Sequence, residues 1–226
     1  MNKAYKFRLY PTKEQTILID KTIGCARFIY NQMLSDKIKH YELTKEKLNN
    51  TPAQYKKEYE WLKEVDSLAL ANAQMNLQTV YNNFFRDKNV GFPKFKSKKR
   101  SRLSYTTNNQ KDSICLSEDS RYIKLPKLKQ VRIKCHRQIG KDELIKSCTI
   151  SKTPSGKYYI SILVEYEKEI TQKKSEKVVA LDYSSPSFYH SSEDEKANYP
   201  RYYRLSEEKL AKEQKKLSRK NKGSNN

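Results

Sequence analysis

The stretch Tyr5-Lys6-Phe7-Arg8-Leu9-Tyr10-Pro11-Thr12 decides the architecture that this sequence predicts. Its first six residues alternate apolar and basic side chains, which is the period of a half-buried strand with Lys6 and Arg8 on its open face. The proline ends the strand, and Thr12 together with Gln15 forms a capping box that starts a helix. A single strand therefore leads directly into helical sequence.

The helical sequence continues far beyond this first helix. Thr51 and Gln54 form a second capping box with Pro52 at the first helical position, which predicts a shorter helix to about Trp61. A third helix begins near Ser67 and presents an apolar stripe. Residues 12 to about 87 are thus predicted to be a helical module inserted after one strand.

From Lys88 onward the pattern changes to short alternating runs separated by turn residues. We expect an antiparallel barrel or a curled sheet here, with room for the N-terminal strand to rejoin it. The predicted strands cover residues 103–106, 113–116, 122–125, 131–134, 148–151 and 158–164.

The last part of the sequence combines a polar stretch, three short strands and a basic helix. Residues 165–176 are charged and are predicted to be a linker, and the apolar run 178–182 ends in the carboxylate of Asp182. Further strands are predicted at 187–190 and 201–205, followed by a helix over 206–220 that has few apolar positions.

Composition restricts the partners of the chain. Lys and Arg number 47 against 26 Asp and Glu, a net charge of +21 spread along the sequence, and there are 17 tyrosines. Cations interleaved with aromatic rings favour a nucleic-acid partner, because cations follow phosphates and rings stack on unpaired bases. A basic protein with no specific polyanion, or a ribosomal protein, is the alternative that charge alone leaves open.

The sequence does not indicate a membrane protein, a zinc-binding protein or a disulfide-stabilised protein. No apolar run approaches a membrane span and the N-terminus lacks the apolar centre of a secretion signal, so we expect a cytoplasmic protein. The four cysteines form no Cys-x-x-Cys pair and are interpreted as free thiols, and the three histidines have no metal-binding spacing.

Several stretches, taken in their order along the chain, resemble the TnpB (OrfB-type) family of bacterial insertion sequences. That family consists of RNA-guided DNA endonucleases related to the type V CRISPR effectors. The stretches that carry the resemblance are Tyr5-Lys6-Phe7-Arg8-Leu9-Tyr10-Pro11-Thr12, Ala26-Arg27-Phe28-Ile29-Tyr30-Asn31, Gly91-Phe92-Pro93-Lys94-Phe95-Lys96-Ser97-Lys98, Lys124-Leu125-Pro126-Lys127-Leu128, Val131-Arg132-Ile133-Lys134, Val179-Ala180-Leu181-Asp182-Tyr183-Ser184 and the helix Lys209–Lys220.

The resemblance implies an α+β protein of several domains. A helical recognition domain (12–90) would be inserted into an oligonucleotide-binding-like, wedge-type β-barrel (1–11 and 91–170). The first part of a RuvC-type, ribonuclease H-like α/β domain (177–226) would follow. The implied partners are a guide RNA and double-stranded target DNA.

Asp182 matches the first of three catalytic acids in that family, whereas the second acid, the third acid and a four-cysteine zinc element are not found in these 226 residues. Two-metal phosphodiester cleavage needs several carboxylates around paired ions. We therefore expect Asp182 to be an incomplete metal ligand, with the Mg²⁺ of intact family members not stably bound, and the chain to bind nucleic acid without cleaving it. Two alternatives stay open: a fragment of an active, longer endonuclease, and a DNA-binding repressor derived from one.

The candidate nucleic-acid-binding residues are cations on predicted strands, a basic run after the Gly-Phe-Pro turn, and three residues near the apolar face of the first helix. Of these three, Tyr30 is equally a candidate for the core, and Asn31 is hypothesised to read an adenine edge. They are Lys6, Arg8, Arg27, Tyr30, Asn31, Lys94, Lys96, Lys98, Lys99, Arg100, Arg102, Lys124, Lys127, Arg132, Lys134 and Arg137.

Overall fold

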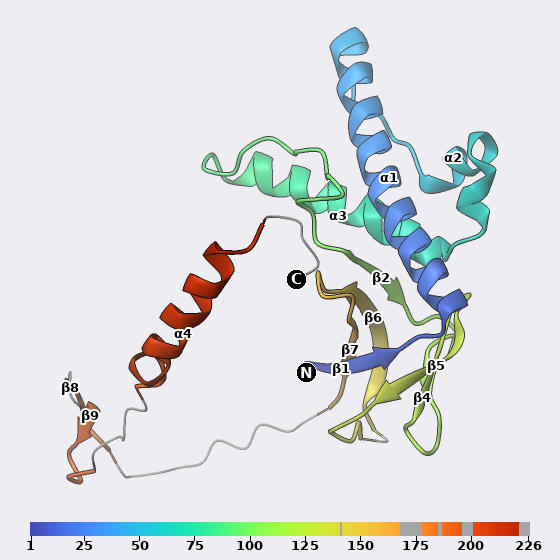
Figure 1. Cartoon of the computed structure of the whole chain (residues 1–226). Helices are drawn as coiled ribbons and strands as arrows, with labels where there is room; N and C mark the ends of the chain where they lie inside the picture. Colours follow the sequence, from blue (N-terminus) through green and yellow to red (C-terminus); the bar gives the residue numbers. More distant parts are fainter. Residues whose placement is uncertain (141, 168–177, 185–186, 196–200, 222–226) are drawn as a thin grey trace. The chain divides into compact units, whose positions relative to one another are not determined.

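A computed structural model describes residues 1–140, 142–167, 178–184, 187–195 and 201–221 (Figure 1). The chain divides into two compact units, residues 1–169 and residues 170–226. Among the described residues, no helix has the length and apolar character that crossing a bilayer requires. Each unit is described by itself below.

The first unit is built on an antiparallel sheet with the N-terminal strand in its centre. The strand order is β2-β6-β7-β1-β5-β4-β3, so β1 lies between β7 and β5, which are far from it in sequence (Figure 1). The expectation that the N-terminal strand rejoins the later ones is confirmed. The strands are β1 (Asn2–Tyr10), β2 (Ser104–Asn108), β3 (Cys115–Leu116), β4 (Tyr122–Leu125), β5 (Lys129–Lys134), β6 (Leu144–Lys152) and β7 (Tyr158–Glu165).

The closed barrel expected from the sequence is not present. β2 and β3 form the two edges of the sheet, and no strand pairing joins them in the described part of the chain. β3 has only two residues, and β2 packs against a helix of the inserted module, so neither edge offers a long ladder to the other. The sheet is therefore open.

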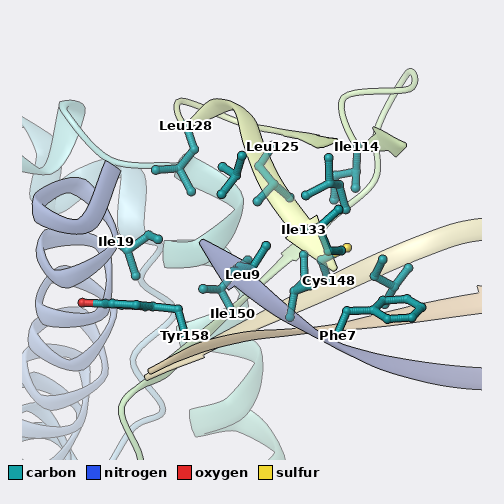
Figure 2. Packing of buried hydrophobic residues seen from close by; sticks show 14 of the residues in the cluster. Phe7, Leu9, Ile19, Ile114, Leu125, Leu128, Ile133, Cys148, Ile150 and Tyr158 are labelled. Atoms are coloured by element: carbon teal, nitrogen blue, oxygen red, sulfur yellow. The ribbon is translucent and has the colours of Figure 1, made fainter. Parts of the chain in front are cut away.

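One face of the sheet forms the main apolar core. In β1 the side chains of Tyr5, Phe7 and Leu9 are buried while their neighbours point to the other face, as the alternation predicted. Figure 2 shows Leu9 lying near Ile150 of β6, with Ile19 of the first helix facing the same cluster. Complete burial of a side chain as large as Phe7 contributes roughly 1.5–3 kcal/mol.

The inserted module contains three α-helices and one 3₁₀ turn, close to the predicted boundaries. Thr12 and Gln15 form the expected capping box at the start of the first helix. This helix packs against the third, and both contribute to a second core around Ile29, Met33 and Leu70. The elements are α1 (Lys13–Thr44), α2 (Pro52–Glu58), a 3₁₀ helix (Glu60–Lys63) and α3 (Ser67–Arg86).

Asp20 connects the helical module to the sheet. Its carboxylate accepts hydrogen bonds from the Lys152 ammonium at 2.6 Å and from the Tyr158 hydroxyl at 3.2 Å, at the hairpin between β6 and β7. Together with the buried Ile19 and Ile23, this contact fixes α1 against the end of the sheet. The helical module and the sheet thus belong to one compact unit.

The second unit contains a two-stranded hairpin and a helix: β8 (Leu181–Ser184), β9 (Phe188–Ser191) and α4 (Tyr202–Ser218). The strand predicted at 201–205 is wrong, because residues 202–205 form the first turn of α4 and Arg201 is its N-cap. The helix formers that follow from Ser206 extend α4 toward the N-terminus, overriding the strand preference of the two tyrosines. The strand predicted at 178–182 begins only at Leu181, and most of the predicted linker lies outside the described residues.

Candidate nucleic-acid interface

The face of the sheet opposite the core carries cations, tyrosines and hydroxyl groups. On β1 this face presents Lys6, Arg8 and Tyr10, the residues between the buried positions. Strand register aligns them in rows with their neighbours: Tyr10 with Arg132 and Tyr122, Arg8 with Lys134 and Tyr159, and Lys6 with Ser161 and Thr149. We call this surface the open sheet face.

Cations and rings alternate across the open sheet face. The Arg8 guanidinium lies 5.5 Å from the centre of the Tyr10 ring and 5.1 Å from that of Tyr159. Arg132 lies 5.9 Å from the Tyr10 ring, and Lys6 lies 5.1 Å from the Tyr159 ring. Such contacts hold the cationic groups in place without neutralising them. The result is a row of fixed positive charges interleaved with aromatic faces.

The open sheet face carries little negative charge. Among the described residues, Glu165 at the end of β7 contributes a carboxylate to this face. That carboxylate already forms an ion pair with the Lys146 ammonium at 2.8 Å. The Nη1 atom of Arg8 is buried, and no described residue accepts a hydrogen bond from it. An unpaired guanidinium donor is costly to bury, so it favours an acceptor supplied by a ligand.

The structure brings together four predicted residues on this face and adds others that the sequence analysis missed. Arg8 on β1 is opposite Lys134 on β5, and Arg132 lies two residues before Lys134 on the same face. Lys6 lies two residues before Arg8, and Lys124 lies on the adjoining β4. Lys127 lies in the turn between β4 and β5, and Arg137 follows β5, both exposed. The residues missed are Tyr10, Tyr122, Tyr159, Ser161 and Thr149, and the same two-residue alternation that selected Lys6 would have selected them.

A second group of predicted residues lies where the basic segment 91–102 crosses α1. The Asn31 side-chain amide donates to the Lys96 carbonyl oxygen at 2.8 Å and accepts from the Lys96 backbone N–H at 2.8 Å. The Lys96 ammonium lies 3.9 Å from the centre of the Tyr30 ring. Burial lowers the pKa of the Lys96 side chain, since the charged form is the one that loses water. We call the Asn31–Lys96 contact the Asn31 clamp.

The Asn31 clamp changes what two predicted residues do. Tyr30 is only 2% exposed, so its ring belongs to the core and supports Lys96 where we expected a possible base contact. The amide of Asn31 that was expected to read an adenine edge is engaged by the backbone of Lys96. A base contact by Asn31 remains a prediction that requires this clamp to open.

The remaining cations of the basic segment are mostly exposed. Ser97 organises the run by accepting hydrogen bonds from the backbone N–H groups of Arg100 and Ser101, which form a turn. Lys94, Lys98 and Lys99 are exposed, as are Arg100 and Arg102, whereas Arg27 on α1 is half-buried.

Asp182 does not occupy a metal centre in the described part of the chain. It is exposed in β8, where its register partner on β9 is His190. The described residues contain no group of three His, Cys, Asp or Glu side chains that could hold a metal ion. The side chains described around Asp182 therefore do not fit a two-metal site.

Comparison with known proteins places these observations in a family. The OrfB_IS605 helix-turn-helix domain model matches residues 1–46, which in this structure form one strand and one long helix. A putative RNA-guided DNA endonuclease of Streptomyces pristinaespiralis is 29% identical over 240 residues, covering 100% of this chain and 57% of that protein. The putative RNA-guided DNA endonuclease InsQ of Escherichia coli K12 is 29% identical over 231 residues, covering 99% of this chain and 56% of that protein.

Two further similarities differ in extent. The virulence protein VsdF of Salmonella dublin is 35% identical over 115 residues, covering 43% of this chain and 95% of that protein. A chain of the Cas12f1–sgRNA–target DNA complex aligns with 97% of this chain and 62% of its own length, at 10% identity and a TM-score of 0.39.

The fold and its basic faces define an α+β protein in which a helical module is inserted after the central strand of a curled sheet. The chain belongs to the OrfB (TnpB) family of insertion-sequence proteins. It spans a little more than half the length of the two endonucleases that it matches, at 57% and 56%.

Proposed function

We propose that the first unit is the nucleic-acid-binding part of an RNA-guided DNA endonuclease, and that it holds a guide RNA and its DNA target. The observation that carries this proposal is the open sheet face, where the Arg8 guanidinium lies within 5.5 Å of the ring centroids of Tyr10 and Tyr159 and its Nη1 atom has no partner in the described chain. The names of the two longer relatives supply the RNA guide and the DNA target.

The physical basis is the match between this face and a polynucleotide. Fixed cations neutralise successive phosphates and release their counterions, while exposed rings such as those of Tyr10 and Tyr122 accept stacked bases. Within the unit, we assign residues 12–90 to the helical recognition domain and residues 1–11 with 91–170 to the sheet domain. The basic segment 91–102 lies between the two and is proposed to contact the nucleic-acid backbone.

We further propose that the 226-residue polypeptide binds without cleaving. Asp182 is exposed on a two-stranded hairpin, and no cluster of metal ligands surrounds it within the described ranges. The test is incubation of the purified polypeptide with guide RNA, Mg²⁺ and a matching DNA target. We expect retention of nucleic acid with no new DNA ends, whereas guide-dependent cutting that Asp182→Ala abolishes would show that the proposal is wrong.

Binding itself is tested by the salt dependence of RNA retention. The variant Lys6→Ala/Arg8→Ala/Arg132→Ala/Lys134→Ala removes four cations from the open sheet face. If each contacts a phosphate, the slope of log K against log salt becomes shallower by about 3, since each contact contributes about 0.7 on a single strand.

A matched control removes four exposed cations from the helical module: Lys39, Lys47, Lys57 and Lys63. We expect the control to retain most of the slope, because these side chains lie outside both basic surfaces. If the slope of log K against log salt is the same for the two variants, the total positive charge of the protein accounts for binding and no particular surface is responsible.

A further inference from the structure

Gly24 lies within α1 although nothing in the described part of the fold requires a glycine there. After proline, glycine is the least favourable residue in a helix interior. A Cβ atom built at Gly24 meets no atom within 4 Å, so close packing does not exclude a side chain. Its backbone angle is not in the left-handed region, in contrast to that of Gly156. The absence of a side chain is therefore unexplained by the chain itself.

The space above Gly24 is an open hollow on the surface of α1. Arg27 and Phe28 line it on the next turn of the helix, and Gln32 and Ser35 line it further along. Phe95, from the basic segment, forms the facing wall. We call this site the Gly24 hollow. Any side chain at position 24 would project into it.

The walls of the Gly24 hollow combine one cation with aromatic rings. No carboxylate lines the hollow, and the described chain gives the Arg27 guanidinium no ion pair. Phe95 is 58% exposed, so its side chain can be reached by a ligand. Phe28 is fixed by edge contacts to Tyr59 and Trp61, both with ring centroids 4.9 Å away.

The facing wall is held in place by the Asn31 clamp. Phe95 precedes Lys96, whose backbone N–H and carbonyl are both bonded to the Asn31 amide at 2.8 Å. Because Asn31 itself lines the hollow, one side chain fixes the distance between its two walls. The hollow is thus pre-organised and does not depend on a freely moving loop.

We propose that the Gly24 hollow binds one nucleotide unit of a phosphodiester strand. Its phosphate pairs with Arg27, its base or sugar packs on Phe95, and the bare backbone at Gly24 lets the strand approach α1 closely. Because no carboxylate lines the hollow, Arg27 favours an anionic group such as a phosphate. The exposed Phe95 ring beside it favours a planar group, such as a base, that is covalently joined to that phosphate. This inference rests on the proposed nucleic-acid-binding function and assigns it a site separate from the open sheet face.

The test is a graded substitution at one position, Gly24→Ala and Gly24→Leu, with a twelve-nucleotide uridine RNA as the probe. Both residues favour helix more than glycine, so urea unfolding should show α1 intact or strengthened. We expect the affinity for RNA to fall two- to threefold with Ala and at least tenfold with Leu. Ala211→Leu is the matched control, since Ala211 is also a small, exposed residue within a helix but lies in α4 of the second unit, outside the hollow and both basic surfaces.

Trp61 provides a second readout, because it is the only tryptophan and contacts Phe28, a wall of the hollow. RNA should change the Trp61 fluorescence of the parent and of Ala211→Leu, and the change should be lost in Gly24→Leu. An equal change with inorganic phosphate would overturn the nucleotide assignment in favour of a simple anion site.

The outcomes separate the two proposals. If the parent binds RNA and Gly24→Leu binds it equally well, the hollow is not a nucleotide site and the proposed function stands. If the parent retains no RNA, the proposed function itself fails. If Gly24→Leu is weakened but Ala211→Leu is weakened as much, the effect is not specific to the hollow and the inference fails.

Discussion

At the scale of single residues, Asn31 links the helical module to the basic segment through two hydrogen bonds to the backbone of one residue, Lys96. A carboxamide is suited to this role because it presents a donor and an acceptor side by side, as a backbone neighbour in a sheet does. The two bonds to Lys96 are 2.8 Å long and half-buried. Loss of the side chain therefore leaves two backbone groups of Lys96 to find water.

We predict that Asn31→Ala destabilises the first unit by about 1–2 kcal/mol, since a net hydrogen bond contributes about 0.5–1.5 kcal/mol. The loss should be concentrated at Lys96, whose backbone N–H would exchange with solvent faster, as measured by hydrogen exchange. Asn31→Asp is the control, because it keeps the acceptor for that N–H but has no donor for the Lys96 carbonyl. Unchanged exchange at Lys96 in Asn31→Ala would contradict the clamp.

The buried thiols give the protein a specific dependence on alkaline pH. Burial raises the pKa of Cys25 to about 11 and that of Cys148 to about 12, from an ordinary value of 9.0. Below pH 9.0 the folded and unfolded chains both keep these protons, so stability is unaffected. Above it, the unfolded chain releases protons that the folded chain retains, and stability falls as pH rises toward 11.

We therefore predict that the free energy of unfolding by urea decreases between pH 9 and pH 11 and that Cys25→Ala/Cys148→Ala reduces this decrease. The double variant will be less stable at neutral pH because it leaves cavities, so the comparison is between slopes against pH. Identical slopes for parent and variant would show that the thiols are not responsible. Cys115, which is exposed, serves as the control position.

At the scale of elements, the start of α1 is stabilised by hydrogen bonds within its own first turn and by hydrogen bonds to the sheet. The Gln15 carbonyl accepts from the Thr12 backbone N–H at 3.0 Å, completing the capping box. Its amide nitrogen donates to the backbone oxygens of Leu128 at 3.1 Å and Gln130 at 2.8 Å, around the turn between β4 and β5. One side chain thus caps a helix and connects it to a hairpin.

This arrangement predicts that replacing Gln15 by alanine destabilises the protein more than replacing the N-cap residue Thr12. Loss of an N-cap side chain usually costs about 1 kcal/mol, which is our expectation for Thr12→Ala. Gln15→Ala removes the hairpin contacts as well, and we expect about 2 kcal/mol from three lost hydrogen bonds. Urea unfolding of both variants measures the order, and a smaller effect for Gln15→Ala would indicate that the hairpin contacts contribute nothing.

At the scale of the whole molecule, the first unit has its own cores and its own basic surfaces. Its apolar clusters are drawn from β1 to β7 and α1 to α3, whereas α4 in the second unit has no buried residue. The open sheet face and the Gly24 hollow are also formed entirely by the first unit. Folding and RNA binding should therefore reside there.

We predict that a polypeptide of residues 1–167 folds cooperatively on its own. Its urea midpoint should equal that of the full 226-residue chain. Its affinity for the twelve-nucleotide RNA should agree with that of the full chain within about twofold. Circular dichroism and filter binding measure the two properties. Failure of this polypeptide to fold would mean that the second unit supplies stabilising contacts to the first.

Local sequence determined the elements, their order and many of their boundaries. Alternation placed β1, the capping residues placed the start of α1, and the excess of 47 basic over 26 acidic residues pointed to a polyanion partner. These features depend on neighbours in the chain, so a sequence contains them directly. The strand predicted at 201–205 failed because the helix formers beyond it decide the conformation of those residues.

Only the tertiary structure decided which residues meet. The pairing of β1 with β5 and β7 sets Arg8 between Tyr10 and Tyr159, a contact across 151 residues from Arg8 to Tyr159 that no local period encodes. Likewise, the hydrogen bonds between Asn31 and Lys96, 65 residues apart, join α1 to the basic segment and place Phe95 beside the hollow above Gly24. Register and packing fix such contacts because they are set by burial of the shared core, whereas the sequence specifies only which side chains are available for them.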